Sequence, residues 1–173
     1  LAKYTFKGKS FVYILFLAGM MIPIQTVIIP LAFTFGKLGI VDNFPVLVLL
    51  YSAFCLSMTV FIVTGYMKGL PDELEEAAVF FRIILPLSMP AIASASIFNF
   101  VSAWNNLLFP LVFISKDSMK TISIGLLSFF GAYTSDYGAV MAAIGVSIIP
   151  PIIMYILLQE KMEKGLTAGA VKG

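Results

Sequence analysis

Long runs of residues without a charge dominate this sequence and restrict what it can fold into. Four such runs cover residues 10–36, 43–67, 83–115 and 137–159. Each is longer than the roughly 20 residues with which a helix crosses a bilayer. We therefore predict an all-α integral membrane protein with four transmembrane helices in a single domain, residues 1–173. The spans are expected over about 11–35, 45–67, 87–113 and 137–158.

The third run is the longest, and a straight helix over 83–115 would measure roughly 50 Å. That length exceeds the thickness of the hydrocarbon layer, so this segment must break, tilt or project from the membrane. By contrast, the uncharged segment 121–135 is too short to span. We expect the loop 116–135 to lie at the external interface or to re-enter the membrane as a lining loop.

The composition excludes several classes of protein. Hydrophobic residues make up 60% of the chain and charged residues only 12%, unlike a soluble domain. Histidine is absent, which removes the commonest metal ligand and general base. The single Cys55 lies in an apolar run and has no partner for a disulfide. We expect a chain that is not an enzyme, binds lipid, and has no metal site, no cofactor and no nucleic-acid partner.

The distribution of basic residues predicts the orientation. If the spans alternate in direction, one side of the membrane carries eight basic residues: Lys3, Lys7, Lys9, Lys68, Arg82, Lys161, Lys164 and Lys172. The other side carries three: Lys37, Lys116 and Lys120. Basic loops stay on the cytoplasmic side. We therefore expect both termini, the loop 68–86 and the tail 160–173 to be cytoplasmic.

Polar residues recur along the third predicted span. Ser96, Asn99, Ala103 and Asn106 follow the spacing i, i+3, i+7 and i+10, which places them in one stripe on a continuous helix. Asparagine in a bilayer needs a hydrogen-bond partner on another helix or access to water. Two interpretations remain open, a contact between helices and a pathway that hydrogen-bonds a polar solute.

The first predicted span contains two prolines. Pro23 and Pro30 are seven residues apart, hence on one face of a helix, and Gln25 lies between them. A proline inside a membrane helix leaves a carbonyl without its donor, which a neighbouring helix or water must replace. A kink packed against a neighbour explains this pattern, and a ligand role for Gln25 is the alternative.

One short stretch between the second and third spans is acidic. Asp72, Glu73, Glu75 and Glu76 follow Pro71, a residue that suits the first position of a helix. Acidic side chains also suit the positive end of the helix dipole. Leu74, Ala77 and Ala78 share one face at i, i+3 and i+4, so we predict a short amphipathic helix. It is either a solvated loop helix or an element that docks on something outside the membrane.

Glu76-Ala77-Ala78, followed by Ile83, Leu85-Pro86-Leu87 and Pro90, resembles the EAA loop of permease subunits in binding-protein-dependent ABC importers. The resemblance implies a cytoplasmic coupling helix that docks on an ATPase subunit. Its contact residues would be Glu73, Leu74, Glu76, Ala77 and Ala78. The family pattern contains roughly ten more residues, about three turns of helix, after the Ala-Ala pair. Here Val79 leads straight into Phe80, so Glu73 to Ile84 is expected to run as one helix into the third span.

Further segments resemble the carbohydrate-importing members of the same family. Residues 104–111 are similar to the family's Trp-Asn segment, which lines the solute pathway, and residues 133–143 to the start of its last helix. Residues 164–173 resemble the carboxy-terminal tail that contacts the ATPase subunits in maltose-type importers. The tail residues implied are Gly165, Leu166, Thr167 and Gly169.

The resemblance covers the whole chain and is greatest to the smaller maltose-type permease subunit. It implies the last four helices of a six-helix type I permease, with the first two helices absent, in a bacterial or archaeal cytoplasmic membrane. The implied partners are an ABC ATPase dimer, a second permease subunit, an extracytoplasmic solute-binding protein and a carbohydrate substrate. The pathway residues would be Ser96, Asn99, Asn106 and Gln25.

The resulting hypothesis is a permease subunit that moves a sugar or oligosaccharide by alternating access, driven by ATP hydrolysis on a partner. An ion-coupled secondary transporter or channel subunit is the alternative from another class. Such proteins usually hold ionisable residues in their spans, and the four predicted spans contain none. A structural assembly subunit would not need the polar stripe. A degenerate, non-functional permease fragment is the remaining alternative.

Overall fold

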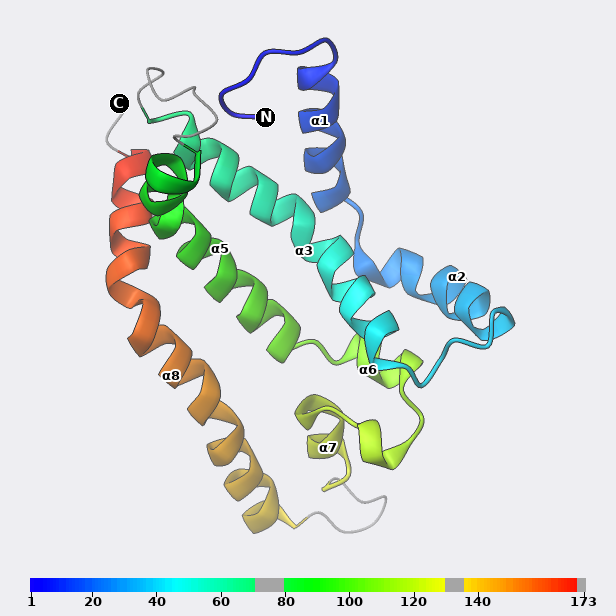
Figure 1. Cartoon of the computed structure of the whole chain (residues 1–173). Coiled ribbons are helices and arrows are strands. Elements are labelled where there is room, and N and C mark those ends of the chain that lie inside the picture. The colour runs from blue at the N-terminus through cyan, green and yellow to red at the C-terminus, as the bar shows by residue number, and fades with distance from the viewer. Residues whose placement is uncertain (71–79, 130–135, 171–173) are drawn as a thin grey trace. The chain divides into compact units, whose positions relative to one another are not determined.

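The computed structural model describes residues 1–70, 80–129 and 136–170, with the backbone alone at 80, 83 and 161–170. Every regular element in these ranges is helical (Figure 1). The elements are α1 (Lys9–Met20), α2 (Ile24–Lys37), α3 (Phe44–Met67), the π turn η2 (Phe80–Ile84), α5 (Leu85–Trp104), α6 (Leu108–Phe113), the 3-10 turn η3 (Asp117–Met119), α7 (Ile122–Leu127) and α8 (Tyr137–Ala170). The all-α prediction is confirmed for the described residues.

Three helices in the described ranges are long and apolar enough to cross a membrane: α3, α5 and the segment Tyr137–Glu160 of α8. The pair α1 and α2 passes the same test of length and composition together, and would make a fourth, broken span. Most of the apolar 18-residue stretch of each candidate is not buried within the protein: the buried share is 6% in α8, 17% in α3 and 33% in α5. Exposed apolar surface of this kind suits a lipid environment, which supports the integral membrane class.

The first predicted span, 11–35, is not one straight helix but is divided between α1 and α2. The chain leaves α1 after Met20, and Pro23 stands in an extended conformation before α2, with φ −70° and ψ 133°. Proline has no N–H to continue the α1 ladder and disfavours a helical residue before it. Pro30 does lie inside α2, where the Thr34 hydroxyl donates to its carbonyl at 2.8 Å. The two prolines therefore do not share a face of one helix.

The third predicted span is also interrupted. α5 ends at Trp104 and α6 begins at Leu108, so 87–113 is not one helix. Pro110 cannot donate to the carbonyl of Asn106, which weakens any helix through this point. The length of this segment predicted that it would break, tilt or project from the membrane, and the structure shows a break.

The last helix continues beyond the predicted span. α8 extends past the expected end near Leu158 as far as Ala170. Residues 159–164 are good helix formers, and adding a residue to an existing helix is easier than starting a new one. The predicted tail is therefore helical over its described part. At the start of α5, the chain is helical from Phe80 through η2, whereas the rest of the predicted helix from Glu73 lies outside the described residues.

Contacts divide the chain into two compact units. Unit 1 comprises Leu1–Met21, Phe54–Asn99 and Tyr155–Gly173, and unit 2 comprises Ile22–Ala53 and Phe100–Met154. In unit 1 the first half of α5 buries small residues, with Ala91 and Ala95 only 1% and 2% exposed. Small residues let membrane helices approach closely. α1 and α3 also approach closely, since a Cβ atom on Gly19 would lie 2.7 Å from the Ser57 hydroxyl oxygen.

Unit 2 has an aromatic core around the short helix α6. Phe109, Pro110 and Phe113 are almost fully buried. The ring of Phe113 lies 5.5 Å from that of Phe35 on α2, and the ring of Phe109 lies 5.7 Å from that of Tyr51 on α3. Tilted and edge-to-face ring pairs at these distances are favourable. α6 is thus docked on α2 and α3.

Candidate functional site

Asn99 forms a hydrogen bond between two helices of unit 1. Its Nδ2 donates to the Thr59 hydroxyl on α3 at 2.7 Å, and that hydroxyl donates in turn to the Cys55 carbonyl at 2.9 Å. The Oδ1 atom of Asn99 is buried and has no donor among the described residues. A buried acceptor without a donor costs about 1–3 kcal/mol. Asn99 therefore joins α5 to α3, and its Oδ1 is an acceptor without a partner among the described residues.

The predicted polar stripe is only partly present. Ser96 is exposed on α5, one turn before Asn99. Asn106 lies beyond the end of α5, and its Oδ1 accepts from the Phe109 N–H at 3.0 Å. Asparagine side chains compete for backbone hydrogen bonds in this way and so favour helix ends. The prediction of one continuous stripe from Ser96 to Asn106 is wrong.

The other predicted site residues are Gln25, the coupling residues and the tail residues. Gln25 is exposed in the first turn of α2, in unit 2, which also contains Asn106. Of the four predicted pathway residues, all of which are described, only Ser96 and Asn99 lie on the same element, α5. The coupling residues lie outside the described residues: Glu73, Leu74, Glu76, Ala77 and Ala78. The tail residues lie in the last turns of α8, where only the backbone is described: Gly165, Leu166, Thr167 and Gly169.

Trp104 joins three elements of unit 2. Its Nε1–H donates to the Ser147 carbonyl on α8 at 3.1 Å, and its own carbonyl accepts from the Ser123 hydroxyl on α7 at 2.9 Å. The last carbonyls of a helix have no partner within it, and here Ser123 supplies one. The sequence placed Trp104 in a pathway segment without this structural role. The only signal was that a buried tryptophan N–H needs an acceptor.

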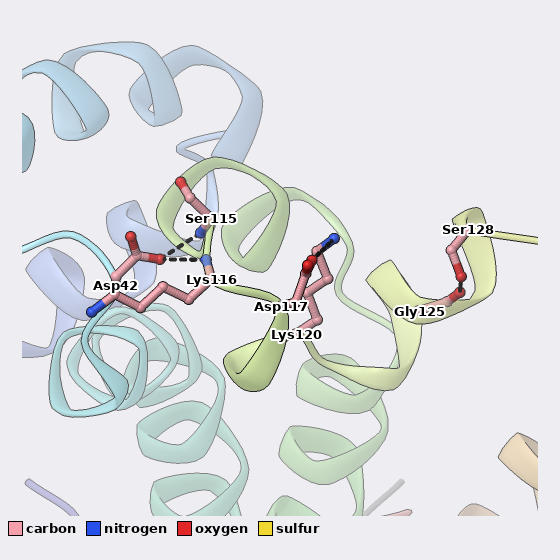
Figure 2. Close-up of polar contacts among 7 residues, drawn as sticks. All are labelled: Asp42, Ser115, Lys116, Asp117, Lys120, Gly125 and Ser128. Carbon is pink, nitrogen blue, oxygen red and sulfur yellow. Dashed lines mark hydrogen bonds and ion pairs between the residues drawn. The ribbon is translucent and has the colours of Figure 1, made fainter.

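Asp42 lies in the loop between α2 and α3 and is not one of the predicted site residues. Its carboxylate accepts hydrogen bonds from the backbone N–H groups of Ser115 and Lys116, the latter at 3.0 Å (Figure 2). Its own N–H donates to the Phe113 carbonyl at 2.9 Å. The backbone has φ 56° at this residue, a left-handed conformation that aspartate tolerates better than most residues. The fold alone brings together these residues, which are more than 70 positions apart.

The two donors lower the pKa of Asp42. The Lys116 N–H has the largest effect and the Ser115 N–H the next, so the pKa of the Asp42 carboxyl lies below its ordinary value of 3.8. A lowered pKa in the folded state means that the carboxylate stabilises the fold above the ordinary pKa. This stabilisation is lost as the pH falls through the lowered value.

Two short-range contacts lie in the segment that follows Lys116, one between Asp117 and Lys120 and one between Ser128 and Gly125. Asp117 and Lys120 form an exposed ion pair at 2.5 Å, and this hydrogen bond lowers the pKa of Asp117 (Figure 2). Ser128 closes α7 by donating to the Gly125 carbonyl at 2.6 Å (Figure 2). An exposed ion pair of this kind contributes little to stability.

A hollow of about 690 Å³ lies between α7 and α8 in unit 2. Its two serines, Ser128 and Ser147, both donate to carbonyls of their own segments. The remaining lining residues are apolar or glycine: Ile122, Gly125, Leu126, Phe129, Ala139, Ala142, Ala143 and Val146. This surface offers few hydrogen bonds to a sugar. In the described ranges, no three side chains of histidine, cysteine, aspartate or glutamate are grouped as metal ligands.

This chain is similar in sequence to known membrane transport proteins. The profile of a family described as "Binding-protein-dependent transport system inner membrane component" matches residues 1–168. The probable ABC transporter permease protein YurM of Bacillus subtilis is 34% identical over 182 residues, which cover 100% of this chain and 61% of YurM.

Two other relatives have names that state a solute. The arabinooligosaccharides transport system permease protein AraQ of Halalkalibacterium halodurans is 36% identical over 182 residues, 100% of this chain and 64% of AraQ. The diacetylchitobiose uptake system permease protein NgcG of Streptomyces coelicolor is 31% identical over 183 residues, 99% of this chain and 61% of NgcG. The chain thus spans less than two thirds of the length of these relatives.

The alignments also show a difference inside the matched region. Those with YurM and AraQ extend over 182 positions, nine more than the 173 residues of this chain. These two relatives therefore have at least nine residues in the matched region that this chain lacks.

Proposed function

Since this chain belongs to the family of inner membrane components of binding-protein-dependent transport systems, we propose that it is the permease subunit of an ATP-driven importer. It would move a sugar or oligosaccharide across the cytoplasmic membrane by alternating access. The family match over residues 1–168 carries the proposal. The names of the relatives AraQ and NgcG, which refer to arabinooligosaccharides and diacetylchitobiose, favour a carbohydrate as the solute.

We infer that ATP hydrolysis takes place on an ABC ATPase dimer that docks on the cytoplasmic side. The segment 71–79 would be the coupling helix, with contacts from Glu73, Leu74, Glu76, Ala77 and Ala78. The end of α8, with Gly165, Leu166, Thr167 and Gly169, would reach the same ATPase subunits, with the C-terminus in the cytoplasm. A second permease subunit and an extracytoplasmic solute-binding protein would complete the importer. The sequence motifs and the family support these assignments.

Among the pathway residues, Asn99 has the strongest support. Its buried Oδ1 is an acceptor without a donor among the described residues, which suits a sugar hydroxyl. Ser96 is exposed one turn away on the same helix and would add a second polar group. The Oδ1 of Asn106 already accepts from Phe109, so Asn106 would contribute mainly through its Nδ2. Gln25 is exposed, and its role rests on the sequence alone.

Uptake in cells tests the proposal. Cells that lack this gene, with and without a plasmid copy, would be given radiolabelled arabinotriose or diacetylchitobiose. We expect the plasmid copy to restore the uptake of at least one of them. Arsenate, which depletes ATP, should abolish this uptake, whereas a protonophore used while ATP is maintained should not. Uptake that follows the proton gradient would instead identify an ion-coupled transporter. If the plasmid copy changes the uptake of neither sugar, the importer role proposed for these carbohydrates is refuted.

The same assay tests the pathway residue. We expect Asn99→Leu to reduce uptake at least tenfold, because a buried hydrogen bond to the solute is worth about 0.5–1.5 kcal/mol and the lost polar surface adds to this. Phe98→Leu is the matched control, since Phe98 is the preceding residue of α5 and is 47% exposed. Undiminished uptake in Asn99→Leu would remove Asn99 from the pathway.

A further inference from the structure

The short helix α6 is held at both ends and along one side by residues of unit 2. At its start, the Phe109 N–H donates to Asn106 Oδ1. Along its side, the rings of Phe109 and Phe113 pack on Tyr51 of α3 and Phe35 of α2. A helix of six residues is not stable alone, so its position depends on these contacts.

The end of α6 is joined to the α2–α3 loop through Asp42. This residue makes three hydrogen bonds to the segment Phe113–Lys116. Its N–H donates to the carbonyl of the first residue, and its carboxylate accepts from the N–H groups of the last two (Figure 2). The loop reaches this segment because α2 ends in a glycine turn. Gly39 has φ 66°, and the Ile40 N–H returns to the Phe35 carbonyl at 3.1 Å, as in a Schellman motif.

We propose that Asp42 is a positioning residue that clamps the segment after α6 to the α2–α3 loop, so that α2, α3 and α6 hold the start of the segment 116–135 in place. The clamp rests on the observed contacts alone. Its importance for uptake rests on the proposed function, in which 116–135 faces the outside of the membrane and the solute.

A carboxylate suits this role better than an uncharged side chain. Hydrogen bonds to an ionised acceptor are shorter and stronger than neutral ones. One Oδ1 atom accepts from two consecutive N–H groups, which fixes both the position and the direction of the Ser115–Lys116 backbone. Asparagine would retain the oxygen and the tolerance of the left-handed conformation but lose the charge. Glycine would retain the backbone conformation and lose the acceptor.

Hydrogen–deuterium exchange in the full chain, reconstituted in lipid nanodiscs, tests the clamp. In Asp42→Gly we expect peptides over 114–120 to exchange about ten- to hundredfold faster, the factor that corresponds to a hydrogen bond with a charged acceptor. Asp42→Asn should show a smaller increase. Asp117→Asn is the matched control, because it removes a neighbouring carboxylate whose partner is the Lys120 side chain.

Two outcomes of the exchange experiment would overturn the clamp. The first is equal exchange over 114–120 in Asp42→Gly and the unaltered chain. The second is faster exchange throughout unit 2 in both Asp42 variants, which would make Asp42 a general stability element rather than a local clamp.

Uptake measurements then test the consequence for transport. Asp42→Gly should lower uptake several-fold, and Asp117→Asn should leave it unchanged. Faster exchange over 114–120 together with unchanged uptake would overturn the positioning role in transport. If the unaltered chain itself supports no uptake, the proposed function fails, while the exchange result still decides whether the clamp exists.

Discussion

The hydrogen bond between Asn99 and Thr59 allows a quantitative prediction. Removing the Thr59 hydroxyl leaves a half-buried polar group unpaired, whereas removing the Asn99 amide does not. Thr59→Val keeps the shape of the side chain and removes the hydroxyl. Asn99 would then be half-buried with neither its Nδ2 nor its Oδ1 paired. Asn99→Leu removes both polar atoms at once, including the oxygen that has no donor among the described residues. We therefore expect Thr59→Val to destabilise the protein more than Asn99→Leu.

The magnitude follows from the geometry. Hydrogen bonds between membrane helices contribute about 0.6 kcal/mol on average and at most about 1.7 kcal/mol. The Nδ2 to Oγ1 distance of 2.7 Å is short, and the Thr59 hydroxyl is polarised by its own bond to Cys55. We expect the upper half of this range, so that Thr59→Val lowers the free energy of unfolding by about 1–1.7 kcal/mol. In the Asn99→Leu background the same change should have almost no effect.

A double-mutant cycle measures this difference. The free energy of unfolding would be obtained for the four proteins by titration with sodium dodecyl sulfate in mixed micelles. Ser96→Ala serves as the control, since Ser96 is exposed on the same helix. A coupling energy below about 0.3 kcal/mol, the usual error of additivity, would show that the two side chains do not interact in the folded protein. Uptake by the Asn99→Leu protein separates a structural role from a pathway role.

Two other contacts give similar tests. Gly19→Val should destabilise the protein by about 1–3 kcal/mol, because the added atoms overpack the contact with Ser57, whereas Gly36→Val, with no atom near its Cβ, is the control. Equal unfolding energies for these two variants would contradict the close approach of α1 and α3. Trp104→Phe should cost about 0.5–1.5 kcal/mol through loss of the N–H bond to the Ser147 carbonyl. An unchanged unfolding midpoint would show that this bond does not contribute.

The sequence was sufficient wherever one local property decided the outcome. The helix α3 occupies Phe44–Met67, where the uncharged run predicts a span over 45–67. The candidate span of α8, Tyr137–Glu160, begins where the run 137–159 begins. In both cases lipid-compatible composition over a sufficient length leaves the backbone few choices except a helix, because its polar groups must be satisfied internally.

The sequence was insufficient where local signals compete. Pro23 lies between α1 and α2, just before α2 begins, whereas Pro30 lies inside α2, although both stand in the same apolar run. Asn106 fits the spacing of a helical stripe, but its side chain bonds to the Phe109 N–H instead. The spacing of polar residues predicts a stripe only if the helix is continuous. At each proline and asparagine, continuity depends on whether the backbone keeps its helical hydrogen bonds or forms other ones.

The sequence by itself determined the helical membrane class and, through motifs spread over its length, the transport family. Apolar runs and short motifs are local, so they can be read without knowing which segments meet. Only the tertiary structure decided that Asn99 bonds to Thr59, that Trp104 joins α5 to α7 and α8, and that Asp42 reaches Ser115 and Lys116. These partners are distant along the chain, from 19 to 74 residues apart. No spacing rule specifies such pairs, because they depend on how the helices pack.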